Sequence, residues 1–174
     1  VFGFIERSRN LIEFDIGFGD AVVPRPEEMV YPSLLGLDEI RLLAYSKESV
    51  IAEKFQAMVY LAEGNSRMKD FYDIYMLSTS FGFDGACLSE AVDETFTRRA
   101  TPLSQIPVIF TDGFMENPDK QVQWSAFCKR IHIEHLTFSE VIVRNRAFLA
   151  PLYEAIVRDE RLIVNWNPEK AEWC

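Results

Sequence analysis

Apolar and polar residues recur with two different periods along the chain, and the change of period divides it into two parts. In residues 11–18 (LIEFDIGF) acids alternate with apolar residues, which predicts a strand with Glu13 and Asp15 on one face. A short apolar run predicts a second strand over 40–44. Between them, residues 19–35 contain three prolines and are expected to form a loop with extended pieces.

From about residue 46 the apolar positions take helical spacing. Ser46 or Ser49 is expected to cap a helix that ends near Ala62, and Ser66 to cap the helix that follows. The tail after Arg161 is ambiguous. Because strands come first and helices dominate afterwards, the pattern predicts an α+β protein with a helical C-terminal half. Three further helices are expected over residues 88–99, 118–131 and 138–158, the first of them after a turn at 83–85.

Composition narrows the class of protein without deciding its function. The chain has 174 residues, 48% of them hydrophobic, which excludes disordered and low-complexity classes and predicts one domain. The net charge of −9 is uneven: residues 13–94 hold 16 acidic and 6 basic side chains, whereas residues 129–161 hold 5 and 6. An acidic front half repels polyanions, which disfavours a general nucleic-acid-binding domain. A carboxylate cluster that binds a divalent metal would give the same composition.

Neither a membrane span nor a disulfide framework is predicted. The longest weakly charged stretch, residues 49–62, still contains Glu53 and Lys54 and is too short and too polar to cross a bilayer. The cysteines are odd in number, widely spaced and never in a C-x-x-C pair, as expected of reduced thiols in a cytoplasmic protein. They are Cys87, Cys128 and Cys174.

Lys54 breaks the pattern of the first predicted helix. The polar stripe of this helix consists of Glu53, Gln56, Tyr60 and Glu63, while the helical neighbours of Lys54 are apolar. A lysine on an apolar face either extends its ammonium to the solvent at the rim or meets a negative partner. The sequence leaves two interpretations open: a surface lysine, or a lysine directed into a cleft towards a phosphate or carboxylate.

The next helix begins with a cluster of alternating charges. Spacings of three place Arg67, Asp70 and Asp73 on one stripe, beside Lys69. Acids in the first turn favour the helix dipole, which explains Asp70 more easily than Asp73. Arg67 and Lys69 are able to neutralise both acids, so an internal ion network and a functional site are both open.

Other candidate ligands are weaker. Glu13 and Asp15 suit a solvent-facing strand, but a carboxylate at a strand end beside a glycine turn is also suited to Mg²⁺. His132 and His135 have no third histidine beside them and are interpreted as residues at a helix end rather than metal ligands. The sequence contains no G-x-G-x-x-G, P-loop or G-x-S-x-G motif.

Three pieces of the sequence together resemble one family. They are IEFDIGFGD (12–20), the run YSKESVIAEKFQAMVYLAEGNSRMKDFYDIYML (45–77), and W-x-x-F-x-x-R (124–130). The central run is the most specific, with a lysine, an alanine three residues later, and then Arg-x-Lys-Asp-x-x-Asp. These pieces resemble the nucleotidyltransferase toxins of the AbiEii/AbiGii type, the toxin half of a bacterial phage-defence (abortive infection) toxin–antitoxin pair.

The resemblance implies a nucleotidyltransferase fold, with a small mixed sheet that carries metal-binding acids and helices packed behind it. Its members transfer a nucleotide from an NTP, some of them to tRNA ends, with Mg²⁺ as the expected metal. By position, Asp15 resembles the family's third carboxylate, which lies on a strand and binds metal. Lys54 resembles the lysine that contacts the triphosphate. The conserved helix cluster corresponds to Arg67, Lys69, Asp70 and Asp73, with Asp73 in a catalytic role. The cognate antitoxin is a functional partner whose direct contact the sequence leaves open.

The sequence also departs from this family. The family's first motif, a Gly-Ser or Gly-Gly turn followed by Asp-x-Asp, has no counterpart here; Glu13-Phe14-Asp15 is the nearest match and follows no such turn. With Val1 as first residue, residues 1–45 are expected to be a remnant of the nucleotidyltransferase sheet, and 46–174 the helical part that carries the Lys/Arg/Asp cluster. The chain alone is therefore expected to be inactive or nearly so, which leaves open whether it acts as an enzyme.

A second hypothesis from another class is a non-enzymatic helical protein-binding module. It would bind its partner through the aromatic residues of the C-terminal helices, although aromatics at helical spacing belong more often to a core. These residues are Trp124, Phe127, Phe138, Phe148 and Tyr153.

Overall fold

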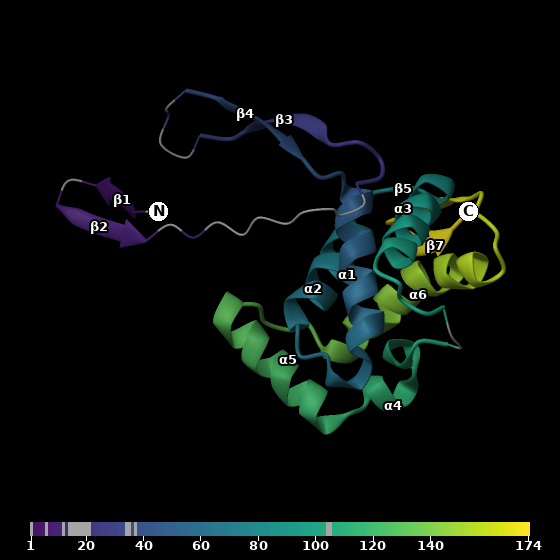
Figure 1. Cartoon of the computed structure of the whole chain (residues 1–174). Helices are drawn as coiled ribbons and strands as arrows, with labels where there is room; N and C mark the ends of the chain where they lie inside the picture. Colours follow the sequence, from purple (N-terminus) through teal and green to yellow (C-terminus); the bar gives the residue numbers. More distant parts are fainter. Residues whose placement is uncertain are drawn as a thin grey trace.

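The computed structural model describes residues 2–5, 7–11, 13, 22–33, 36, 38–103 and 106–174. Helices make up most of the described chain after residue 46, and short strands precede and follow them, so the predicted α+β class is confirmed (Figure 1). The strands are β1 (Phe2–Ile5), β2 (Ser8–Leu11), β3 (Glu27–Tyr31), β4 (Ile40–Ala44), β5 (Phe83–Asp84), β6 (Asn165–Asn167) and β7 (Glu172–Trp173). The helices are α1 (Lys47–Leu61), α2 (Met68–Ser80), α3 (Gly85–Arg98), α4 (Asp112–Met115), α5 (Pro118–Ile131) and α6 (Phe138–Val157), with 3₁₀ turns η1 (Ala62–Gly64) and η2 (Val108–Phe110).

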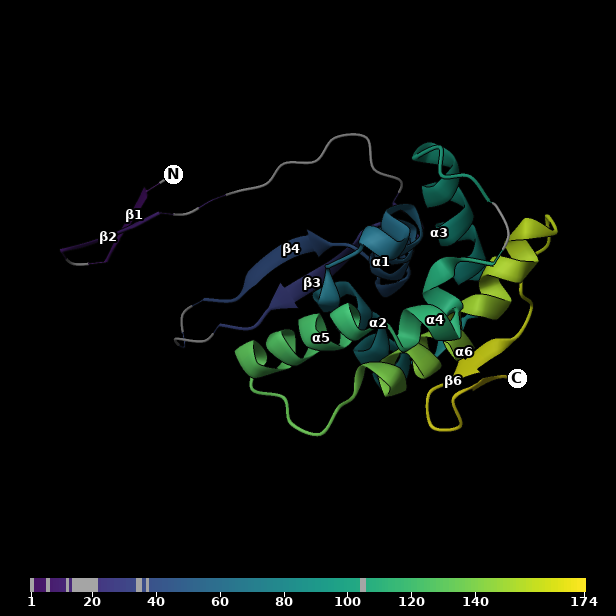
Figure 2. The ribbon, with the colours of Figure 1, turned by 90° about the horizontal axis from the view of Figure 1, so that it is seen from below.

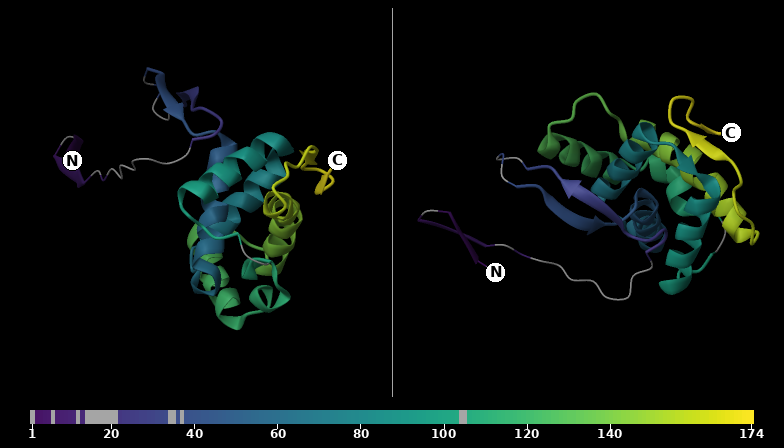
Figure 3. Two further views of the ribbon diagram at one scale, coloured as in Figure 1. Left: turned by 45° about the vertical axis from the view of Figure 1, so that its right-hand side comes forward. Right: turned by 90° about the horizontal axis from the view of Figure 1, so that it is seen from above.

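Every strand pairing among the described residues is antiparallel. β1 pairs with β2, β3 with β4, and β6 lies between β5 and β7. Figures 1 and 3 show the two N-terminal hairpins projecting from the helical body. The strand predicted over 40–44 is confirmed as β4. Its partner β3 lies within the segment expected to be a loop with extended pieces, and all five of its residues are exposed. Most of the strand predicted over 11–18, including Asp15, lies outside the described residues.

The β3–β4 hairpin has one apolar face. Directly opposite residues of an antiparallel pair share a face, and the register places Met29 opposite Leu42 and Tyr31 opposite Ile40. All four side chains are exposed. The other face is more polar, with an ion pair between Arg41 and Glu28 at 3.7 Å. The hairpin therefore contributes exposed apolar surface rather than core.

The core lies among the helices. α1 packs against α3 and α2, while α6 packs against α2 and α3, and α5 lies along α2 and α6 (Figure 2). Phenylalanines dominate the buried set, and their rings contact one another between elements that are far apart in the sequence. The largest fully buried side chains include Phe55, Phe71, Phe96, Phe138 and Phe148. This core fixes the faces that α1 and α2 present to each other.

α1 begins where the sequence predicts. The Ser46 side chain accepts a hydrogen bond from the Ser49 amide at 3.1 Å, which satisfies one of the free N–H groups at the helix start. Ile51, Phe55 and Met58 follow at helical spacing and are fully buried. The N-cap and the apolar stripe together set the rotation of α1 about its axis, and this rotation decides where Lys54 points.

The predicted starts of α2 and α3 are wrong. Ser66 does not cap α2, which begins at Met68 without a side-chain cap; instead the Asn65 carboxamide accepts from the Arg67 amide at 2.8 Å. α3 begins at Gly85, three residues earlier than predicted, because the Asp84 carboxylate caps it through the Cys87 amide. A side-chain cap therefore marks the start of α3, whereas none marks the start of α2.

Gly85 is held too closely by the C-terminal segment to carry a side chain. A Cβ at this position would lie 2.4 Å from the backbone oxygens of both Leu162 and Val164. We expect Gly85→Ala to displace the segment leading to β6 and to destabilise the protein by about 2 kcal/mol in chemical denaturation. Gly113→Ala is the control: nothing lies within 4 Å of its Cβ, so equal losses from both variants would contradict the steric explanation.

Candidate functional site

The packing of α1 on α2 brings together the charged residues that the sequence singled out. Lys54 lies on the side of α1 that faces the first two turns of α2, where Asp70 and Asp73 are located. Its ammonium lies 2.9 Å from Asp70 Oδ1 and 2.6 Å from Asp73 Oδ2. Lys54 is therefore not a surface lysine extended to solvent. Its side chain is only 20% exposed and meets two negative partners.

Two further cations complete a five-residue ion network. Arg67 Nε lies 2.9 Å from Asp70 Oδ2, and Lys69 Nζ lies 2.6 Å from Asp73 Oδ2. The first contact lacks hydrogen-bond alignment, since the buried Asp70 Oδ2 accepts no hydrogen bond from the residues described. Three cations against two carboxylates leave the cluster with a formal charge of +1, and Arg67 and Lys69 stay largely exposed. The cluster is thus an internal ion network with positive charge directed towards solvent.

The protonation of Lys54 is secured by its partners. Burial by itself would lower the pKa of Lys54, but the hydrogen bonds and charges of Asp73 and Asp70 outweigh it and raise the pKa above its ordinary value of 10.5. A lysine with a raised pKa stabilises the fold fully below its unfolded-state pKa and loses this contribution only as the pH rises through the higher folded-state value.

This raised pKa leads to a test by pH. The difference in unfolding free energy between the wild type and Lys54→Met should stay constant from neutral pH up to about 10, and should shrink only above the ordinary lysine pKa of 10.5. Urea denaturation at a series of pH values measures it. A difference that already shrinks between pH 7 and 9 would contradict the assigned ion pairs.

A cavity of about 360 Å³ opens beside Lys54. Lys54, Arg67 and Asp70 line it, together with Glu53 and Arg99. Arg99 lies 3.9 Å from Glu53 and donates to the Gln56 carboxamide at 2.9 Å. The polar stripe predicted for α1 is in part buried under the chain that follows α3, because Gln56 also donates to the Thr101 hydroxyl.

The participation of Arg99 and Thr101 was missed at the level of sequence. They lie more than forty residues from Gln56 in the chain, and no local pattern links them. The only feature of the sequence that pointed to such partners was Gln56 itself. A carboxamide that is buried on a packed helix needs hydrogen-bond partners. Arg99 adds a second arginine, besides Arg67, to the lining of the Lys54 cavity.

The described residues do not form a Mg²⁺ site. No group of three or more histidine, cysteine, aspartate or glutamate side chains suited to a metal occurs among the residues described. Asp70 and Asp73 are already neutralised by lysine and arginine, and the predicted metal ligand Asp15 lies outside the described residues. His132 lies at the C-cap of α5, as interpreted from the sequence. The Mg²⁺ expected from the resemblance therefore stays a prediction.

The aromatic residues proposed for a protein-binding module are buried. Trp124, Phe127, Phe138, Phe148 and Tyr153 are each at most 5% exposed. The Trp124 indole donates to the Leu136 carbonyl, and its ring contacts Phe127 and Phe138. Aromatic residues in such contacts stabilise the core and offer no surface to a partner. That version of the second hypothesis is wrong.

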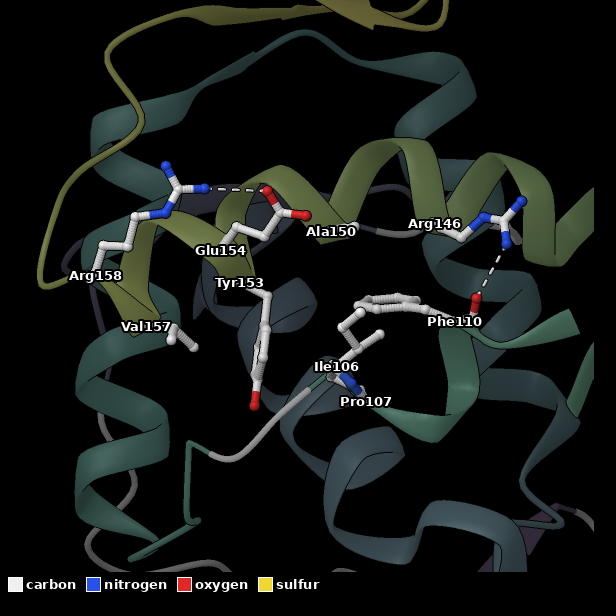
Figure 4. Close-up of a pocket in the computed structure, with 9 residues that line it drawn as sticks. All are labelled: Ile106, Pro107, Phe110, Arg146, Ala150, Tyr153, Glu154, Val157 and Arg158. Atoms are coloured by element: carbon white, nitrogen blue, oxygen red, sulfur yellow. Dashed lines mark hydrogen bonds and ion pairs between the residues drawn. The ribbon is translucent and has the colours of Figure 1, made fainter.

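A larger cavity, of about 700 Å³, lies elsewhere, between α6 and the segment around η2 (Figure 4). It is lined mainly by apolar groups, among them Ile106, Phe110 and Val157. Its two arginines already have partners: Arg158 pairs with Glu154, and Arg146 donates to the Phe110 carbonyl. None of the residues predicted for the nucleotidyltransferase site lines it. Size alone does not make it the functional site, because Arg146 is also paired with Asp112, so each of its two arginines has a carboxylate partner.

Comparison with known families identifies one family. A family model described as "Nucleotidyl transferase AbiEii toxin, Type IV TA system" matches residues 2–148, which is more than half of the chain. The chain belongs to the AbiEii family. The matched range contains the whole ion network and the W-x-x-F-x-x-R segment. Searches of curated proteins and of solved structures find no match.

Membership of the AbiEii family has direct consequences. The family consists of nucleotidyltransferase toxins of type IV toxin–antitoxin systems, so an NTP substrate and an antitoxin partner are implied. The combination of helical body and small sheets agrees with a partial nucleotidyltransferase-like fold. Within the part of the chain that the structure describes, we find no helix with the length and apolarity needed to cross a bilayer.

Proposed function

We propose that this AbiEii-family chain carries the phosphate-binding part of a nucleotidyltransferase site, which acts in transfer of a nucleotide from an NTP to RNA, with tRNA as the expected acceptor. The observation that carries the proposal is the convergence of Lys54, Arg67 and Lys69 on two carboxylates beside an open cavity. These three residues lie in the part of the chain matched by the family.

The proposed role of Lys54 is to bind the triphosphate. An ammonium has three N–H donors, of which Asp70 and Asp73 take two. The remaining donor, with Arg67 and Arg99 on the cavity walls, gives a triphosphate several cationic contacts. Since Lys54 is partly withdrawn from water, its attraction for a phosphate exceeds that of a fully hydrated lysine. Charge that develops on departing pyrophosphate would be neutralised there.

Asp70 and Asp73 are proposed to hold Lys54 in position, and Asp73 in addition to act in catalysis. Both carboxylates keep the ammonium charged and fix its direction across the gap between α1 and α2. Asp15 is proposed as a metal ligand on the family resemblance alone. The chain by itself is proposed to transfer little or no nucleotide, because its sequence contains no Asp-x-Asp motif.

The test supplies the motif that the sequence does not contain. A segment with the Gly-Ser and Asp-x-Asp motif of an AbiEii-family toxin is fused ahead of Val1, and transfer of label from each α-labelled NTP to RNA is measured with Mg²⁺. The fused protein should transfer label, and the unfused chain should not. Transfer at the wild-type rate in both Lys54→Ala and Asp73→Ala would contradict the proposed mechanism.

A second experiment tests the unfused chain by itself. Micromolar binding of Mg·NTP to the unfused chain in calorimetry would contradict its proposed inactivity.

A further inference from the structure

A second cavity lies next to the ion network, between the start of α2 and α5, and has a volume of about 430 Å³. We call it the α2–α5 cavity. Arg67, Lys69 and Asp70 line it from α2, and Arg130 lines it from the last turn of α5. Arg67 and Asp70 also line the Lys54 cavity, so the two cavities adjoin at these residues. The charged lining of the α2–α5 cavity sums to +2.

Arg130 is the distinctive residue of the α2–α5 cavity. Its guanidinium lies over the ring of Phe127, 5.7 Å from the centroid, which fixes its position at the cavity wall. No carboxylate lies within ion-pair distance of it among the residues that the structure describes. Arg67 and Lys69 do have carboxylate partners, yet both side chains are more than half exposed. The cavity thus has one cation without a counter-charge and two with donors left for a ligand.

The walls of the α2–α5 cavity are held in place by buried contacts. The ammonium of Lys120, a buried residue of α5, donates to the Asn65 carbonyl at 2.7 Å. The side chain of Asn65, which is fully buried, accepts from the Arg67 amide. These two hydrogen bonds fasten the turn before α2 to the start of α5. A ligand would meet cations whose backbone positions are already set, which reduces the entropy lost on binding.

We propose that the α2–α5 cavity binds a backbone phosphate of the RNA acceptor, while the triphosphate occupies the Lys54 cavity. The assignment rests on the proposed function, because it takes RNA as the acceptor. An arginine pairs with a phosphate through two parallel N–H donors, and Arg130 is the arginine of this cavity without a carboxylate partner. The acidic surface elsewhere repels a polyanion, so contact is confined to one or two phosphates.

The experiment is a titration of the unfused chain with a short single-stranded RNA that carries a fluorescent label at its 5′ end and a free 3′ hydroxyl. Fluorescence anisotropy is recorded without NTP between about 50 mM and about 200 mM salt. The wild type should bind with a slope of log K against log salt of about −0.7 to −1.4, as for one or two phosphates. Arg130→Ala should weaken binding about tenfold and reduce the slope by about 0.7.

Lys129→Ala is the matched control. Lys129 is exposed, carries the same charge, and is the neighbour of Arg130 in the chain, but it does not line the cavity. Its replacement should change RNA affinity less than about twofold, as for a screened surface charge. Equal losses in Lys129→Ala and Arg130→Ala would overturn the site, because they would show general attraction to the surface. Absence of RNA binding to the wild type at the lowest salt would overturn it as well.

Two competition experiments distinguish the source of the phosphate. Mg·ATP should not displace RNA from the wild type; displacement would assign the α2–α5 cavity to the nucleotide and overturn the proposal. Inorganic phosphate should compete only weakly, and full displacement at low millimolar concentration would indicate a site for free phosphate instead. The titration contains no NTP, so it tests RNA binding by the α2–α5 cavity even if Lys54 has no role in transfer. The transfer assay of the fused protein tests the proposed function separately.

Discussion

Lys54→Met should reduce nucleotide transfer by the motif-supplied fusion protein at least about 100-fold, the loss typical of removing one charged donor from developing transition-state charge. The physical reason is that Lys54 is the most enclosed of the three cations beside its cavity, and the two carboxylates hold it in one direction. Methionine keeps most of the volume of the side chain but removes the charge. The measurement is the initial rate of label transfer at saturating NTP.

The same substitution should also destabilise the protein. Asp70 is 5% exposed in its side chain, and without Lys54 its charge would be balanced by Arg67 alone. Breaking a buried pair costs several kcal/mol, but Lys54 is partly accessible to water, so we expect a loss of about 1–2 kcal/mol in urea denaturation. At temperatures well below the unfolding transition the variant is then still folded, and its lost transfer is due to the missing charge.

Lys170→Met is the control for both effects. Lys170 lies in an exposed ion pair with Glu172 near the C-terminus, far along the chain from the site, and such a pair contributes little to stability. Its replacement should leave transfer unchanged and stability within about 0.5 kcal/mol. If Lys54→Met lowers stability as predicted but transfers at the wild-type rate, the ion network is structural and the proposed role of Lys54 is wrong.

Phe148→Ala should destabilise the protein by about 4 kcal/mol, as for a large aromatic removed from a closed core. Phe148 is fully buried on α6, and its ring lies 5.1 Å from that of Phe83 and 4.9 Å from that of Trp166. It also stacks on Trp173 at 5.5 Å with nearly parallel planes. The cavity left behind would remove the surface on which β6 and β7 pack. Denaturant unfolding followed by tryptophan fluorescence measures the loss.

Two further variants make this result interpretable. Phe148→Leu should cost about 1.5 kcal/mol and stay folded if the alanine variant does not fold. Phe81→Ala removes a half-exposed ring and should cost less than about 0.5 kcal/mol. A loss from Phe148→Ala no larger than that from Phe81→Ala would show that the C-terminal strands are not anchored by the aromatic cluster.

Much of the helical half followed from the sequence alone. α5 coincides with the predicted range of 118–131, and α6 ends one residue before its predicted end. Both have strong caps in sequence, Asn117 before α5 and the Thr137–Glu140 capping box before α6, and both bury a clear apolar stripe. Local signals suffice where the cap and the period agree. They failed for α2, which has no side-chain cap although Ser66 was expected to supply one.

The C-terminal tail shows where local signals end. A strand of two or three residues, such as β6 or β7, is too short to show a period in the pattern of apolar and polar residues. Trp166 is nevertheless almost fully buried, since its ring packs on Phe148 and its indole donates to the Ser78 carbonyl at 2.7 Å. These partners come from α6 and from the end of α2, so only the tertiary structure orders the tail.

The sequence by itself determined the family, the α+β class and the identity of the charged residues, because a lysine on an apolar helix face and a dense charge cluster are local and unusual features. The tertiary structure alone decided how these charges pair. Lys54 reaches Asp70 and Asp73 because the core turns one face of α1 towards the first turns of α2. It also decided that Arg130 shares a cavity with Arg67 and Lys69, although Arg130 lies more than sixty positions after both of them in the chain. Which charged residues form ion pairs across two helices depends on the rotation of each helix about its axis. The packing of the core sets this rotation, and the composition of the chain does not.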